Sequence, residues 1–241
     1  MRVPGAVEML DLWERGGSRT PIERSLELLN LCAIAEDPGV LSIGRRDASL
    51  FRLREKFFGR RLSNIADCPS CGERVEWGGD VRDFLEIDQG HEGMNTDGFM
   101  LDAAPYSLRF RLPNSYDLLN VSAYRDNPEK LLKDCILEVH EEGEPFDAGC
   151  LPEKVLGLLE QRMAEEDPQA DISMLLNCPK CSHAWEMSFD ICSYLWMEID
   201  HWARRVLREV AMLAAAFGWS ELDILRMSSR RRQLYLEMIR Q

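Results

Sequence analysis

The last third of the chain has the most regular pattern of apolar and polar positions. Apolar side chains recur every three or four residues from Ile191 to Phe217, which places them on one face of an α-helix. The pattern predicts one helix of roughly 40 Å that ends at Gly218. Ser220 then caps a short helix, and an arginine-rich helix follows. Residues 191–241 are therefore predicted to form a C-terminal helical region.

Helical spacing also dominates residues 1–66. An amphipathic segment occupies residues 1–16. Thr20, followed by proline, is a favourable cap and first turn for a second helix that reaches Asp37. A third helix, with basic residues between its apolar ones, ends at Gly59. We therefore expect residues 1–66 to be an N-terminal helical segment.

Residues 78–177 combine both periodicities. Alternation predicts a strand over 106–112, and a second strand at the end of the region. Helical spacing predicts helices over 128–143 and 151–166. The polar, glycine-rich stretch 88–98 predicts a flexible or hairpin-bearing loop. The region is interpreted as an inserted acidic α+β segment.

Two copies of one cysteine pattern flank this inserted region. Cys68 and Cys71 lie in CPSC, and Cys178 and Cys181 lie in CPKC. A CxxC turn can direct both sulfurs at one ion, and each copy runs into a strand-like alternation. One CxxC is weak evidence for a metal site, but two with proline at the same position are strong. We expect these four cysteines to be the ligands of one site.

The predicted site holds one structural Zn²⁺ per chain and joins residues 67–77 and 178–190 into a split zinc ribbon. Four thiolates saturate a tetrahedral zinc ion and leave no position for water or substrate. The alternatives are a thioredoxin-type redox dithiol, which lacks the expected βαβ pattern, and a site that holds iron or no metal. His183 lies beside the second pair and is interpreted as a surface or outer residue, since four thiols are available.

Together these patterns predict an α+β, predominantly helical fold with a split four-cysteine zinc ribbon and a long C-terminal helix. The chain has four further cysteines, each alone in an apolar or helical context: Cys32, Cys135, Cys150 and Cys192. The N-terminus lacks the apolar region of a secretory signal, which disfavours a disulfide framework and predicts a cytoplasmic protein. The longest apolar runs are far shorter than a membrane span, so no membrane association is expected.

The net charge of −13 is concentrated in the middle of the chain. Residues 67–182 carry 25 acidic and 10 basic side chains, which accounts for the whole excess. Such a surface repels phosphate backbones and favours basic protein partners, although it also simply maintains solubility. The triple arginine at 230–232 is one helical turn, so no nucleic-acid partner is expected. The sequence also contains no phosphate-binding glycine loop, HExxH or GxSxG motif, and we do not expect an enzyme.

Several segments together resemble the baseplate hub assembly chaperone family of T-even-type phages, and related proteins of phage-tail-like contractile injection systems. They are LPNSYDLL after a strand, an acidic helical middle, CPKCSHAWEMSFDI, a long helix, and FGWSELDILRMSSRRRQLYLEMI. The last segment is the most telling. The sequence differs from the phage proteins in its length and in having both CPxC copies complete.

The resemblance implies a non-enzymatic chaperone that helps to build the hub or spike end of a contractile tail, with hub or spike proteins as partners. Trp196, Trp202 and the FGW segment are candidate apolar anchors, and core packing is the alternative for them. Two other functions remain open: a permanent structural baseplate subunit, which shares every sequence feature, and a zinc-ribbon nucleic-acid-binding protein, which the charge distribution opposes.

Overall fold

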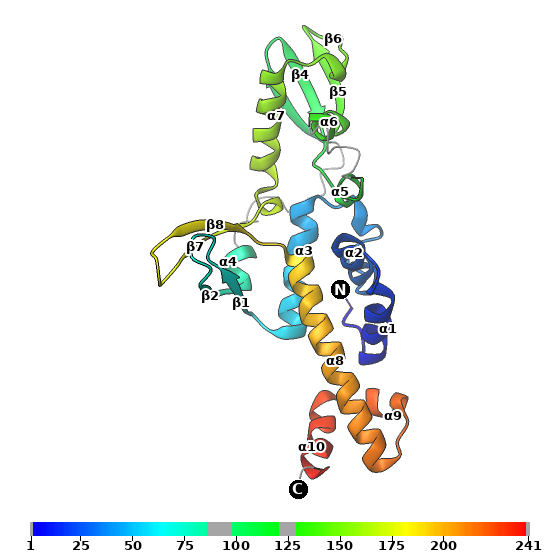
Figure 1. Cartoon of the computed structure of the whole chain (residues 1–241). Coiled ribbons are helices and arrows are strands. Elements are labelled where there is room, and N and C mark those ends of the chain that lie inside the picture. The colour runs from blue at the N-terminus through cyan, green and yellow to red at the C-terminus, as the bar shows by residue number, and fades with distance from the viewer. Residues whose placement is uncertain (1, 86–97, 121–128, 240–241) are drawn as a thin grey trace. The chain divides into compact units, whose positions relative to one another are not determined.

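The computed structural model describes residues 2–85, 98–120 and 129–239 (Figure 1). Helices outweigh strands, one long helix lies near the C-terminus, and the four CPxC cysteines cluster, which confirms the predicted fold class. The chain divides into two compact units, residues 1–38 with 192–241 and residues 39–191. In the described ranges, no helix combines the length and apolarity needed to cross a bilayer. The four-part division made from the sequence stays a prediction.

The first unit is helical. Its helices are α1 (Ala6–Gly16), α2 (Pro21–Leu31), α8 (Ile191–Phe217), α9 (Glu221–Leu225) and α10 (Ser229–Ile239). The core of the unit includes Leu10 of α1, Val206 and Leu213 of α8, and Leu236 of α10. Trp202 packs partly buried against this core, as expected for a core residue. The long helix therefore serves as the common surface for α1 and α10.

The predicted helix starts and stops in this unit are mostly confirmed. Thr20 caps α2, with its hydroxyl accepting from the amide of Glu23, and Ser220 caps α9 in the same way. The prediction that the second helix reaches Asp37 was wrong. Helix α2 ends at Leu31, because Ala33 adopts a left-handed φ of 51° and reverses the chain.

The second unit contains every strand found in the described residues. Its helices are α3 (Ile43–Phe58), α4 (Val81–Leu85), α5 (Ser115–Leu119), α6 (Glu129–Asp134) and α7 (Glu153–Glu166), with 3₁₀ turns η4 (Ala148–Cys150) and η5 (Pro168–Ala170). A further 3₁₀ turn, η1 (Pro38–Val40), lies at the boundary of the two units. Its strands are β1 (Arg61–Asp67), β2 (Arg74–Asp80), β3 (Phe99–Ala103), β4 (Tyr106–Phe110), β5 (Ile136–Glu141), β6 (Glu144–Pro145), β7 (Ser173–Asn177) and β8 (Ala184–Ser188).

Strands β3 to β6 form an antiparallel sheet in sequence order. Alternation directs Leu108 and Phe110 of β4 to one face, where both are fully buried. Helix α7 supplies Leu156 and Leu159 against that face (Figure 1). The strand over 106–112 and the helix over 151–166 are thus confirmed, with ends shifted by up to two residues.

The helix predicted over 128–143 was wrong. Only α6 is helical there, and residues 136–141 form β5, which pairs with β4. Residues 142 and 143 then make a two-residue turn, with φ of 51° at Glu142 and 91° at Gly143. The loop predicted over 88–98 lies almost entirely outside the described residues. Strand β1, within the segment expected to be helical, was also not predicted.

An aromatic cluster anchors the parts of this unit that carry the cysteines. Phe51 of α3 stacks on Phe84 of α4 at 5.2 Å and on Phe189, just after β8, at 5.8 Å. Trp77 of β2 meets Phe189 edge-on at 5.5 Å. One apolar cluster therefore joins the ends of both cysteine-bearing hairpins to α3.

Candidate metal centre

Each CPxC segment forms the turn of its own β-hairpin. In the first hairpin β1 pairs antiparallel with β2, and the last pair is Asp67 with Arg74. In the second β7 pairs with β8, and the last pair is Asn177 with Ala184. Both hairpins appear side by side in Figure 1. The strands predicted after each CPxC segment are confirmed, as is the strand predicted before the second one, which is β7. Of these four strands, only β1, before the first CPxC segment, was not predicted.

The two turns contain the same pattern of backbone hydrogen bonds. In the first, the amide of Cys68 donates to the carbonyl of Glu73, and the amide of Gly72 donates to the carbonyl of Cys68, each at 2.8 Å. The second turn repeats both bonds around Cys178, each at 2.9 Å. Every position in the second hairpin follows its counterpart by 110 residues. The two hairpins are thus a structural repeat, which the sequence indicates through the CPxC signature and the alternation that follows each copy.

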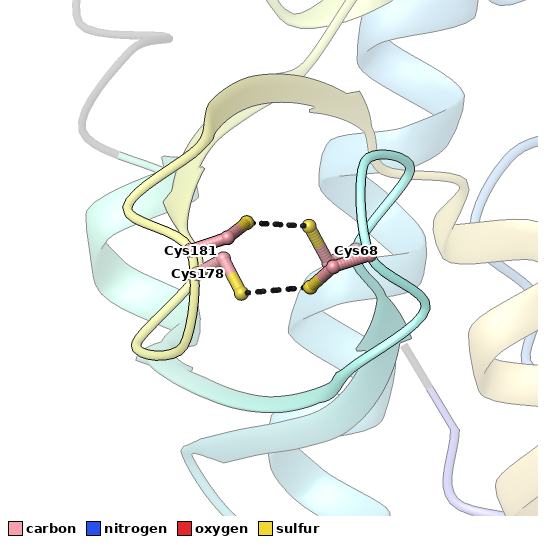
Figure 2. Close-up of side chains that lie close together, drawn as sticks. Cys68, Cys178 and Cys181 are labelled. Atoms are coloured by element: carbon pink, nitrogen blue, oxygen red, sulfur yellow. Dashed lines mark hydrogen bonds between the residues drawn. The ribbon is translucent and has the colours of Figure 1, made fainter.

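The four sulfur atoms face one another between the two turns (Figure 2). The sulfurs of Cys68 and Cys181 are 3.7 Å apart, and those of Cys71 and Cys178 are 3.6 Å apart. All four lie within 4.8 Å of one another. These distances are far longer than a disulfide bond, and all four thiols are free. The structure therefore brings together all four cysteines that the sequence indicated.

The sulfur spacing fits a tetrahedral metal ion. Zinc–sulfur bonds of about 2.3 Å give sulfur–sulfur edges of about 3.8 Å in a regular tetrahedron. The two shortest distances are close to that edge. Each turn supplies two ligands, and each close pair joins one turn to the other. Among the described residues, this is the one cluster of metal-ligating side chains with such spacing.

The first cysteine of each turn is buried and the second is exposed. Cys68 and Cys178 are each 2% exposed and pack with Val75 and the partly buried Trp185. Cys71 lies at the surface, as does its counterpart in the second turn. An ion held here would be covered on its inner side by apolar side chains and reachable from solvent on the other.

Backbone amides lower the pKa of one cysteine in the cluster, and burial and neighbouring thiols raise the pKa of another. The amides of Cys181 and Lys180 point at the sulfur of Cys178, and despite burial they lower its pKa to about 7. At Cys71 the amide of Glu73 also favours the thiolate, but burial and three neighbouring thiols outweigh it and raise the pKa to about 12. The fold thus favours the thiolate at Cys178 and disfavours it at Cys71, and a bound cation would favour the thiolate form of the ligands that hold it.

An ion pair bridges the two turns at the surface. Nζ of Lys180 lies 2.8 Å from a carboxylate oxygen of Glu73. Both side chains are well exposed, so the pair contributes little to stability. His183 is exposed, and its ring lies parallel to that of Trp185 at 6.2 Å. No pattern in the sequence indicates the Glu73–Lys180 pair, because the two residues are far apart in the chain and only the fold brings them together.

A four-thiolate site of this form is suited to structure rather than catalysis. With all four positions filled by sulfur, an ion would have no open position for a substrate. It would instead fix β1–β2 to β7–β8 and close the chain between them. A bound ion would therefore stabilise the fold, and a partner protein would bind to other surfaces of the chain.

Comparison with known protein families shows where the chain belongs. Residues 18–193 match the family model described as T4 bacteriophage base plate protein, which is well over half of the chain. The chain belongs to this family. All four cysteines lie in the matched range, which ends near the start of α8. No curated protein and no solved structure gives a significant match.

Membership of the T4 baseplate family confirms the coarser part of the resemblance seen in the sequence. A phage baseplate-related role follows from it, and so does interaction with other baseplate proteins. The hub, the spike and the chaperone activity are finer statements that the family description does not include.

Proposed function

We propose that this baseplate-family protein is a non-enzymatic assembly chaperone for the hub or spike end of a contractile phage tail or phage-tail-like injection system. Family membership is the observation that carries the baseplate role. The finer assignment rests on the resemblance of the C-terminal FGWSELDILRMSSRRRQLYLEMI segment to hub assembly chaperones. The partners would be hub or spike proteins, bound in the cytoplasm before the particle is complete.

The four-cysteine centre would hold one structural Zn²⁺. Support comes from the donor set, because four thiolates at tetrahedral spacing suit zinc. Cys68, Cys71, Cys178 and Cys181 would be the ligands. The ion would supply folding free energy by closing the chain segment between the two turns. A closed site of this kind favours a binding role over an enzymatic one.

The test separates a chaperone from a permanent subunit by where the protein is found. The full chain would be tagged in cells that also express the neighbouring baseplate genes, and free and particle fractions would be analysed by quantitative mass spectrometry. A chaperone predicts hub or spike protein bound to the free fraction, and absence of the tagged chain from finished particles. Stoichiometric presence in particles would instead make it a structural subunit.

A nucleic-acid-binding role is tested on the purified chain. Labelled duplex DNA would be titrated at low and moderate salt, because binding through phosphates weakens steeply as salt rises. The proposal predicts no measurable affinity at moderate salt. Tight, salt-dependent DNA binding would favour the zinc-ribbon nucleic-acid-binding alternative.

A further inference from the structure

Exposed apolar side chains concentrate near the end of the first unit. Six of the fifteen large apolar side chains that are exposed in the described residues lie within 212–239: Met212, Phe217, Leu222, Leu234, Met238 and Ile239. This stretch is short compared with the rest of the chain. Scattered exposed apolar residues need no explanation, but a concentration of them marks a contact surface.

Helix α10 has two different apolar faces. Leu236 and Arg232 lie on the buried face, where Leu236 joins the core of α8 and α9. Leu234 and Met238, four residues apart, lie together on another face and are 49% and 62% exposed. The core of the unit thus uses one side of α10 and leaves a second apolar stripe at the surface.

Aromatic rings extend this stripe toward the end of α8. Tyr235, beside Leu234, meets Trp219 at 4.8 Å and Phe217 at 5.7 Å. Phe217 stacks on Trp219 at 4.5 Å and is still 40% exposed. Rings that brace one another in this way form a firm surface, which lowers the entropy lost when a partner binds.

Arginines border the stripe at its N-terminal end. Arg230 lies one turn before Leu234, and the guanidinium of Arg231 sits 5.7 Å over the ring of Tyr235. Arg226 precedes both and is exposed. In the part of the chain that the structure describes, none of these three arginines forms an ion pair, whereas Arg232 pairs with Glu209. Three unmatched cations on a protein of net charge −13 are a local reversal of sign.

We infer that Arg230, Arg231, Leu234, Tyr235 and Met238 of α10, together with Phe217, form a docking surface, here called the α10 surface, for an acidic amphipathic helix of a partner protein. The apolar stripe at i, i+4 spacing matches the apolar side of such a helix, and carboxylates on its flank would pair with the arginines. The inference rests on the proposed function, which makes the partner a hub or spike protein. The α10 surface lies beyond the residues matched by the family model.

Charge complementarity selects this occupant over two others. A nucleic acid would use the arginines but leave the aliphatic stripe of Leu234 and Met238 without a role. A second copy of this chain could offer acidic residues from 67–182, which makes self-association an outcome that the test must separate. An acidic helix that also carries apolar side chains uses every feature of the α10 surface.

The test uses the full chain and purified hub and spike proteins of the same particle, with affinities from biolayer interferometry. One variant, Leu234→Ser with Met238→Ser, removes the stripe, and another, Arg230→Glu with Arg231→Glu, reverses the charge. Each is expected to weaken binding at least tenfold, and the wild-type affinity should fall with salt. The matched control is Ile65→Ser with Leu175→Ser, which removes two exposed aliphatic side chains elsewhere and should bind as the wild type does.

The outcomes separate the two proposals. If the wild-type chain binds none of the hub or spike proteins, the proposed function is wrong and the docking inference falls with it. If the wild type binds and both variants bind equally well, only the docking inference is wrong. The docking inference would also be wrong if only the charge variant lost binding and the wild type bound single-stranded DNA tightly. In that case the surface would bind a nucleic acid.

A second measurement does not depend on the folding of the variants. A photo-crosslinking amino acid at Met238 in the full chain should join an acid-rich helical segment of the bound hub or spike protein, identified by peptide mass spectrometry. The same group at Leu175 should not. Crosslinks from position 238 to a second copy of this chain, or to a basic segment, would contradict the inference.

Discussion

Gly72 and Ser182 occupy the same place in the two cysteine turns. Each follows the second cysteine of its CPxC, and each donates its amide to the carbonyl of the first cysteine. Both have left-handed backbone angles, with φ of 71° at Gly72 and 59° at Ser182. Glycine adopts this conformation freely, whereas a serine side chain disfavours it. The second turn is therefore built with more backbone strain than the first.

This asymmetry predicts opposite effects for reciprocal substitutions. Ser182→Gly should raise the free energy of unfolding of the metal-loaded protein by about 0.5–1 kcal/mol, and Gly72→Ser should lower it by about 1 kcal/mol. A Cβ at Gly72 would meet nothing within 4 Å, so only the backbone matters there. Urea titrations monitored by circular dichroism measure both. Changes of the same sign in the two variants would contradict the assignment of backbone strain to Ser182.

Gly16 allows α1 to approach Trp196 of α8. A Cβ at Gly16 would lie 2.2 Å from the indole ring, which is also covered by the guanidinium of Arg24 at 4.7 Å. Gly16→Ala should therefore destabilise the protein by about 1–3 kcal/mol, because the ring must move. The matched control is Gly17→Ala, where the nearest atom is 3.6 Å away and φ is −53°. Thermal unfolding should separate the pair, and equal melting temperatures would contradict the packing described.

The pair of Glu209 and Arg232 joins α8 to α10. Nε of Arg232 donates to Glu209 at 3.1 Å, and both side chains are less than a tenth exposed. Glu209→Gln should cost about 3–5 kcal/mol, because it leaves a buried guanidinium without a counter-charge. Arg205 also faces Glu209, at 3.9 Å, but is 64% exposed. Arg205→Ala should change stability by less than about 0.5 kcal/mol, and a comparable loss in both variants would rule out burial as the cause.

Asp47 should make the protein less stable as pH rises, which is the opposite of the usual effect of a carboxyl group in a folded protein. Burial raises its pKa to about 6, against the attraction of Arg46, whose Nε donates to Asp47 at 2.7 Å. Asp190 and Asp167 raise it further. The folded protein then retains a proton that the unfolded chain has released. This component of the unfolding free energy should fall by about 3 kcal/mol as pH rises from about 4 to 6, and stay low above that.

Denaturant titrations across this pH range test the effect. Asp47→Asn should remove the falling component, so that the difference between wild type and variant changes between pH 4 and 6 and is constant above. Asp200 is the contrasting case, because hydrogen bonds from Arg204 and Trp13 lower its pKa. Asp200→Asn should remove stability that is present above the ordinary aspartate pKa and lost as pH falls. A pH-independent difference for Asp47→Asn would show that its pKa is ordinary.

The sequence predicted elements well where the local pattern had one interpretation. The helix at 191–217 carries a long one-sided stripe, and Thr20 and Ser220 supply capping side chains. Helix α2 was extended too far because its C-terminal turn uses Ala33. The amides of Ala33 and Ile34 bond back to Asn30 and Leu29, a reversal that usually needs glycine. No residue type marked that end.

The error at 128–143 has a different cause. Apolar residues at 131, 132, 135, 136 and 139 fit a helix as well as they fit the short helix and strand that form. Pairing of β5 with β4 decides the outcome, and that is a tertiary interaction. Gly143 suits the end of a helix, but it also suits the two-residue hairpin turn between β5 and β6 in which it lies, because that turn needs positive φ. The cysteine cluster was predictable because its chemistry is carried by residue type and spacing alone.

The most direct test of the account is the metal content and metal–sulfur geometry of the purified chain. The account predicts one zinc per chain by inductively coupled plasma mass spectrometry, and four sulfur neighbours at about 2.3 Å by X-ray absorption. The Cys68→Ser, Cys178→Ser double variant should lose the ion and much of its resistance to unfolding. A full zinc equivalent retained in that variant, or a zinc with nitrogen ligands in the wild type, would contradict the four-thiolate centre.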